Sequence, residues 1–294
     1  MTSATMRTLL ATLVLLASVA CTKAQTESIA LSNRGVKAFE NGDVNQAAAL
    51  FERSIALYPK NGLAHYHLGI IMLHDFNDLD GAGRELNEAA NLNPRDLEVT
   101  FQLARLAMMK GEVDTALKHF QDVIEGDGGH AGALYWSGVG LAGKGKLVPA
   151  DDMYRKAVKA DPGYARAFNA MGVAYLENGA ETEAMAVFRE AIRLNPNDAE
   201  SHHNLALVLM GMGNDKAAVD EFGKSLEHDP TNTTCAFNLA NALIRLARYR
   251  QASFYLKKFI VEGSAQGSEL VEPAKMVYNN LQRLIADLKE EQGP

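Results

Sequence analysis

The sequence predicts an all-α fold, a solenoid of about seven helix-turn-helix repeats with one further helix at the C-terminal end. The first observation is an alanine that recurs every 34 residues, with a single step of 35. The second is a large apolar residue four positions after each alanine, and the third is a small residue about twelve positions before it. The recurring alanines are Ala47, Ala82, Ala116, Ala150, Ala184, Ala218 and Ala252.

This spacing is typical of paired helices. Two antiparallel helices cross closely only where side chains are small, and a large residue one turn away fills the space beside the crossing. Glycine ends the first helix of a pair, and proline stops the second helix. The turn glycines are Gly42, Gly111, Gly145, Gly179 and Gly213, and the closing prolines are Pro59, Pro94, Pro162, Pro196 and Pro230.

The fifth unit, FNAMGVAYLENGAETEAMAVFREAIRLNP, carries the pattern most completely. It resembles the tetratricopeptide repeat family, with matches at Gly172, Tyr175, Gly179, Ala184, Phe188, Ala191 and Pro196. The resemblance covers residues 28–266 and implies a right-handed α-solenoid. The seventh unit departs from the pattern, because Ala247 replaces the turn glycine and no proline closes it. The seven units begin near Ser28, Gly62, Leu97, Ala131, Ala165, Ala199 and Thr233.

Residues 267–294 predict a capping helix. Pro273 suits the first turn of a helix, where its missing N–H has no intrahelical partner to lose. Apolar residues then share one helical face, at Val277, Leu281, Leu284 and Leu288. A helix of this kind covers the exposed end of a repeat stack.

Residues 1–20 predict an export signal, because Arg7 precedes an apolar run of about a dozen residues, too short to span a bilayer comfortably. The segment from Ala17 to Cys21 resembles a bacterial lipobox. That resemblance implies cleavage before Cys21, lipidation of its thiol, acylation with a fatty acid such as palmitate, and a short linker over residues 21–27. Thr22 in place of aspartate implies the outer membrane. The alternative is a soluble exported protein that begins with Cys21.

The composition and motifs favour no enzyme. The net charge is −7 and basic residues are scattered, which disfavours nucleic-acid binding. Two cysteines are too few for a disulfide scaffold or a zinc site. His202 and His203 are neighbours that point apart on a helix, and Cys235 has no activating partner nearby in the sequence. We therefore expect no catalytic residue, no metal site and no cofactor.

The resemblance places the first helix of each repeat along a concave groove, which is mostly apolar and suits an apolar or amphipathic segment of a protein partner. Asparagines recur at one register position, as in a ladder that bonds an extended peptide, although other residue types interrupt it. Any of these side chains has the alternative of packing between repeats. The groove candidates are Tyr66, Ile70, Phe101, Arg105, Met108, Tyr135, Val139, Asn169, His203, Asn204, Leu207, Phe237, Asn238 and Asn241.

Together these features predict a non-catalytic scaffold, anchored by lipid to the outer membrane and facing the periplasm, that assists assembly of a membrane complex. In architecture it resembles the pilotins of type IV pilus systems, which help a secretin pore assemble. Two further interpretations stay open: an adaptor for periplasmic cell-wall enzymes, and a soluble exported repeat protein. An enzyme of unrecognised type would instead require a metal or an activity that no motif indicates.

Overall fold

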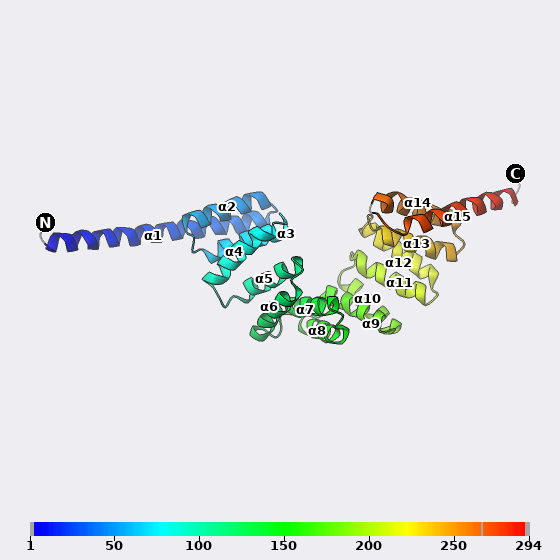
Figure 1. The fold of residues 1–294 in the computed structure, drawn as a ribbon, viewed down its shortest axis with the longest axis horizontal. Helices are drawn as coiled ribbons and strands as arrows, with labels where there is room; N and C mark the ends of the chain where they lie inside the picture. Colours follow the sequence, from blue (N-terminus) through cyan, green and yellow to red (C-terminus); the bar gives the residue numbers. More distant parts are fainter. Residues whose placement is uncertain (1–2, 266, 292–294) are drawn as a thin grey trace. The chain divides into compact units, whose positions relative to one another are not determined.

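The computed structural model describes residues 3–265 and 267–291, and every regular element within these ranges is an α-helix (Figure 1). The chain divides into two compact units, residues 1–144 and 145–294, and the boundary falls in the turn of the fourth repeat. Within each unit the two helices of a repeat pack as a pair, as the alanine spacing predicts. The all-helical repeat fold is therefore confirmed.

The first unit holds three contiguous apolar clusters, each shared by successive helices. The large residue four positions after each recurring alanine lies at their centres, where Phe51, Leu86 and Phe120 are fully buried. The helices are α1 (Ser3–Glu40), α2 (Val44–Leu57), α3 (Gly62–His74), α4 (Leu79–Leu92), α5 (Leu97–Met109), α6 (Val113–Gly126) and α7 (Ala131–Gly143).

The second unit has one continuous apolar cluster that extends from Ala184 to Leu281. Phe188, Phe222 and Leu256 occupy in it the positions that Phe51 and its counterparts occupy in the first unit. The helices are α8 (Leu147–Ala160), α9 (Ala165–Glu177), α10 (Glu181–Leu194), α11 (Ala199–Gly211), α12 (Asp215–His228), α13 (Thr233–Arg245), α14 (Tyr249–Ala265) and α15 (Val271–Glu291).

In the first and second repeats the small residue lies directly against the large one. A Cβ atom added to Gly35 would lie 2.8 Å from Cε1 of Phe51, and one added to Gly69 would lie 2.8 Å from Cγ of Leu86. Both separations are too short for carbon atoms, so a larger residue would push the two helices apart. The sequence spacing thus reports a real packing contact.

The turns within repeats require left-handed backbone. Gly179 has φ +70°, a conformation that glycine adopts without steric cost. Ala247 stands at the corresponding place in the seventh repeat and has φ +55°, which a side chain disfavours. The departure from the repeat pattern therefore changes the residue but preserves the turn.

The N-terminal segment is part of α1, which runs without a break through the residues expected to form an export signal and a linker. The Cys21 side chain lies outside the described part of the structure, so its lipidation stays a prediction. Among the described residues, no helix combines the length and apolar character needed to cross a bilayer.

The C-terminal helix α15 packs on α14, but it is rotated from the orientation that its sequence predicts. Of the four residues on the predicted apolar face, only Leu281 is buried. Val271 and Ala274 complete the buried side, because α14 covers α15 from one direction only. The outer edge of the apolar stripe, at Val277, Leu284 and Leu288, is 37% exposed.

Candidate partner-binding faces

Five of the first helices, α3, α5, α7, α11 and α13, begin at side-chain caps, whereas α9 begins at Tyr164 without one. Asn61 and His130 accept hydrogen bonds from the backbone N–H groups of Ala64 and Ala133, and Asp96 caps α5 in the same way. In the second unit, α11 and α13 begin at Asp198 and Asn232. We describe the groove candidates of each unit separately.

Arg105 is the centre of the candidate face in the first unit. Its guanidinium lies over the ring of Trp136, 5.4 Å from the centroid, and its Nη1 donates to Nε2 of His74 at 3.1 Å. His74 accepts that bond as a neutral imidazole, because burial and the Arg105 charge lower its pKa. Tyr135 contacts the edge of the same tryptophan, at 5.3 Å between centroids. The result is a cation stacked on one aromatic ring and hydrogen-bonded to a histidine.

A polar group continues this face along α5. The Tyr66 hydroxyl donates to Oε1 of Glu98 at 3.2 Å, and Nε2 of Gln102 donates to the same oxygen at 2.9 Å. Burial and the Glu98 carboxylate raise the pKa of Tyr66. The Gln102 side chain is buried, and it also contacts His74. It therefore joins the Tyr66 group to the Arg105 group within the same face.

The remaining candidates of the first unit are partly or fully buried. Phe101 is 9% exposed and packs against Phe120 and His130, so this side chain serves the core. Met108 packs on the same cluster and is half-buried. The candidates that combine apolar character with partial exposure are Ile70 and Val139.

Amide side chains dominate the corresponding helices of the second unit. Nδ2 of Asn204 donates to Oδ1 of Asn169 at 3.0 Å, which joins α11 to α9. His203 turns to the other side of Asn204 and contacts the edge of Phe222 at 5.5 Å. Burial lowers the pKa of His203, and its Nδ1 has no hydrogen-bond partner within the chain.

The other second-unit candidates divide between core and surface. Phe237 packs on Phe259 with 5.0 Å between ring centroids, and Leu207 is packed against the same cluster. Asn238 and Asn241 are half-buried on α13. The face of this unit is therefore richer in amides, whereas the face of the first unit is richer in aromatic rings.

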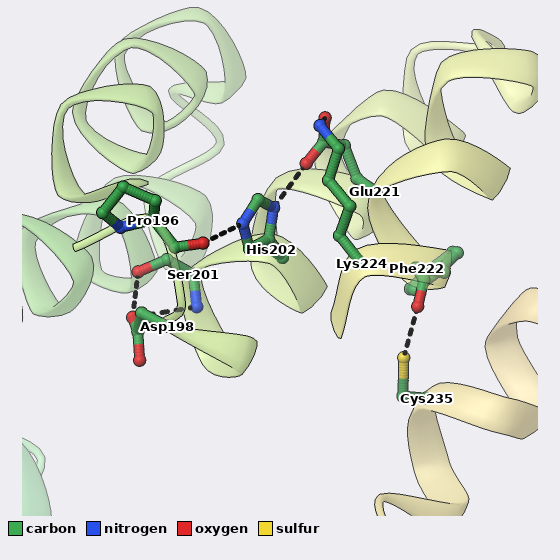
Figure 2. A network of polar contacts seen from close by, with 8 residues as sticks. All are labelled: Pro196, Asp198, Ser201, His202, Glu221, Phe222, Lys224 and Cys235. Carbon is green, nitrogen blue, oxygen red and sulfur yellow. Dashed lines mark hydrogen bonds and ion pairs between the residues drawn. The ribbon is translucent and has the colours of Figure 1, made fainter. Parts of the chain in front are cut away.

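In the second repeat, and again in the sixth, a buried histidine joins the two helices of the repeat. We call this arrangement a histidine clamp. We did not predict it from the sequence. Figure 2 shows the example in the sixth repeat, where Nδ1 of His202 lies 2.6 Å from Oε2 of Glu221 and Nε2 lies 3.0 Å from the Pro196 carbonyl. Lys224 contacts the other carboxylate oxygen at 2.8 Å. Burial alone would raise the pKa of Glu221, but the hydrogen bonds from Lys224 and His202 outweigh it and hold the pKa below its usual value.

The second repeat has the same clamp. His65 lies 2.6 Å from Glu85 and 2.9 Å from the Pro59 carbonyl. A carboxylate and a carbonyl only accept, so a protonated imidazole satisfies both contacts. The sequence signal was present, because only the two repeats with histidine at this register position have glutamate at the facing position.

Side chains that could act as nucleophiles or as metal ligands are dispersed or buried. Cys235 is fully buried, as expected, and its thiol contacts the Phe222 carbonyl at 3.5 Å (Figure 2). Burial raises the pKa of this thiol. Within the described residues, no three side chains of His, Cys, Asp or Glu converge to hold a metal ion.

Comparison with protein families identifies the repeats. A family described as Tetratricopeptide repeat matches residues 33–96, a second family of that description matches residues 199–232, and one described as TPR repeat matches residues 181–213. Residues 33–96 and 181–232 thus match tetratricopeptide repeats, and the helix pairs of the described structure are consistent with that family. No curated protein sequence matches the chain significantly.

Solved structures share the fold at low sequence identity. YrrB, described as a TPR protein with an unusual peptide-binding site, is 23% identical, with a TM-score of 0.52 over 66% of this chain and 97% of YrrB. A tetratricopeptide repeat protein from Parabacteroides merdae is 17% identical, with 0.62 over 88% and 99%. The Pseudomonas aeruginosa pilF structure is 18% identical, with 0.66 over 73% and 96%. At these identities the likeness shows the fold alone.

Proposed function

We propose that this protein is a non-catalytic interaction scaffold that binds a protein partner through the first helices of its repeats. The observation that carries the proposal is a half-buried group of side chains on α3, α5 and α7, in which the Arg105 guanidinium lies over the Trp136 ring and the Tyr66 hydroxyl donates to Glu98. Aromatic rings and arginine are the side chains that most often anchor protein interfaces. The peptide-binding site described for YrrB supports the same kind of partner.

We further propose that Cys21 carries a lipid anchor and that the scaffold works at the outer membrane, facing the periplasm. The support is the lipobox resemblance of residues 17–21 and the short distance along the chain from Cys21 to the first repeat. In this arrangement the partner is a membrane complex under assembly, as for pilotins and their secretin pore. An adaptor for periplasmic cell-wall enzymes is the alternative, and its partners would be soluble hydrolases.

The binding face is tested by capture of partners from the native envelope. We expect Tyr66→Ala combined with Gln102→Leu to reduce the captured partner at least tenfold, because the change removes an aromatic ring and the side-chain amide that joins it to the Arg105 group. Lys118→Ala combined with Gln121→Leu, on the exposed side of α6, is the matched control and should capture normally. Equal capture by both double variants would contradict the proposed face.

The anchor is tested separately, by fatty-acid labelling of the wild type and Cys21→Ser with membrane fractionation. We expect label on the wild type alone, in the outer-membrane fraction. A soluble, unlabelled wild type would contradict lipidation while leaving the binding face intact. A captured pore protein would favour the pilotin-like role, and captured hydrolases would favour the adaptor.

A further inference from the structure

The outer side of α14 differs from the outer side of every other second helix. Arg250, Phe254, Lys257 and Val261 follow one another at steps of four, three and four residues, so they form a single stripe along the helix. All four are exposed, and the exposed fractions of Phe254 and Val261 are 66% and 63%. We call these four residues the α14 stripe.

The repeat register allows a direct comparison with the same four positions in the other second helices. Those stripes are polar, small or of mixed charge, apart from Val148 of α8, which is 79% exposed, and none contains an aromatic residue. In α10 they are Thr182, Ala186, Arg189 and Arg193, in α12 they are Lys216, Asp220, Gly223 and Glu227, and in α6 they are Asp114, Lys118, Gln121 and Glu125. The combination of an exposed aromatic ring with neighbouring cations is therefore specific to α14.

Most cations of this region form no ion pair with a described residue. From Arg245 to Glu262 the chain carries five basic residues and one acid, in a protein whose net charge is −7. Arg245 pairs with Asp215 at 3.1 Å, and Lys258 donates to the Pro230 carbonyl at 2.6 Å. Arg248, Arg250 and Lys257 are exposed and make no ion pair with a described residue. The stripe is thus an apolar strip flanked by uncompensated positive charge.

We propose that the α14 stripe docks on an anionic lipid surface. An exposed phenylalanine and valine flanked by arginine and lysine match the requirements of an interfacial helix, whose apolar side chains enter the headgroup region while cations meet the phosphates. The stripe lies along the outside of one helix and offers no enclosed groove, so it fits an extended lipid interface better than a peptide. The excess of positive charge complements anionic headgroups.

The expected affinity is modest. Each cation near an anionic surface contributes about 1 kcal/mol, and two buried apolar side chains contribute comparable amounts. A contact of this strength holds a protein at a membrane when a second attachment raises its local concentration. This inference builds on the proposed membrane location, but it requires neither lipid on Cys21 nor a partner on the first-helix faces.

The test is co-sedimentation of the exported full chain carrying Cys21→Ser with vesicles of phosphatidylcholine alone or with 30% phosphatidylglycerol added. We expect binding to the anionic vesicles that 0.5 M salt abolishes. Arg250→Gln combined with Lys257→Gln should weaken binding about 30-fold, from about fivefold for each cation. Phe254→Ser should weaken it without changing its salt dependence. Because every variant has the same N-terminal segment, the affinity of that segment for lipid is common to all.

The matched control removes the same two charges from equivalent exposed positions, with Arg189→Gln combined with Lys216→Gln, and should bind as the parent does. Equal losses in both double variants would mean that only net charge matters and would overturn the stripe as a site. Equal binding to neutral and anionic vesicles, or no vesicle binding together with capture of an acidic protein, would also overturn the proposal. None of these outcomes changes the interpretation of the fatty-acid labelling or of the partner capture, which test the proposed function separately.

Discussion

The first-helix faces of the two units use different chemistry on the same scaffold. In the first unit Arg105 lies over the ring of Trp136, and Tyr135 contacts the edge of that ring. In the second unit Asn169 and Asn204 bond to each other and His203 is neutral. Because the repeat backbone is the same, the difference lies entirely in the side chains. A partner segment of uniform chemistry would therefore not complement both faces.

The largest effect on stability is expected from a core substitution that destabilises the second unit and leaves the face of the first unit intact. Phe222→Ala deletes a fully buried ring beneath His203 and should destabilise the second unit by about 3–5 kcal/mol. We expect the Trp136 fluorescence of the first unit to stay native at temperatures where the helical signal of the second unit has been lost. Thermal melts followed by circular dichroism and by fluorescence measure this. Coincident transitions would contradict independent faces.

The clamp at His202 predicts the next largest effect. Glu221→Gln leaves the buried imidazole without its carboxylate and should cost about 3 kcal/mol at pH 7. The pKa of Glu221 is lowered in the fold, so its contribution is present above the unfolded value of 4.5 and is lost as pH falls through the folded value. Urea titrations between pH 3 and 7 should therefore show a smaller acid-induced loss in Glu221→Gln. An unchanged pH slope would contradict the clamp.

Titration of His203 is expected to have a smaller effect on stability, in a different pH range. Burial lowers its pKa below 6.5, so the unfolded chain binds a proton more readily than the fold does. Stability should therefore rise with pH across the interval from the folded value up to about 6.5. His203→Phe removes the titrating group, and its stability should be flatter across that interval than that of the wild type. Parallel curves for the two proteins would contradict the buried neutral histidine.

Loss of the hydrogen bond between Asn169 and Asn204 is expected to have the smallest effect on stability. Asn204→Ala removes one hydrogen bond at a half-buried site and should cost about 1 kcal/mol, measured by urea denaturation. Asn238→Ala is the control, because it lies at the same register position and no described residue bonds to its side chain. A cost equal to that of the control would show that the Asn169–Asn204 bond contributes nothing to stability.

Sequence periodicity predicted the packing of helices well because that packing repeats. The contact between Gly35 and Phe51 follows from spacing alone, since any larger residue at that crossing would collide. The buried side of α15 was predicted only in part, because Leu281 is buried but Val277, Leu284 and Leu288 lie to one side of the buried Val271 and Ala274. The rotation of a helix about its axis depends on the neighbouring helix and not on the spacing of its apolar residues.

The candidate faces were less predictable from the sequence. Phe101 and Ile70 both lie on first helices, yet Phe101 packs in the core and Ile70 is partly exposed. The difference depends on the ring of His130 beside Phe101, a contact from the start of another repeat. The histidine clamps were missed for a related reason, because their partners lie about twenty residues apart and only alignment of the repeats within the chain brings them together.

The most direct test of the account is site-specific photo-crosslinking in the native host, with the crosslinker at Ile70 in the first-unit face, at Leu207 in the second-unit face, and at Lys118 and Arg189 on second helices as controls. The account predicts crosslinked protein from Ile70 and Leu207 and none from the two controls, with different peptides of the partner attached at the two faces. Crosslinks of equal strength from the control positions, or none from Ile70 and Leu207, would contradict it.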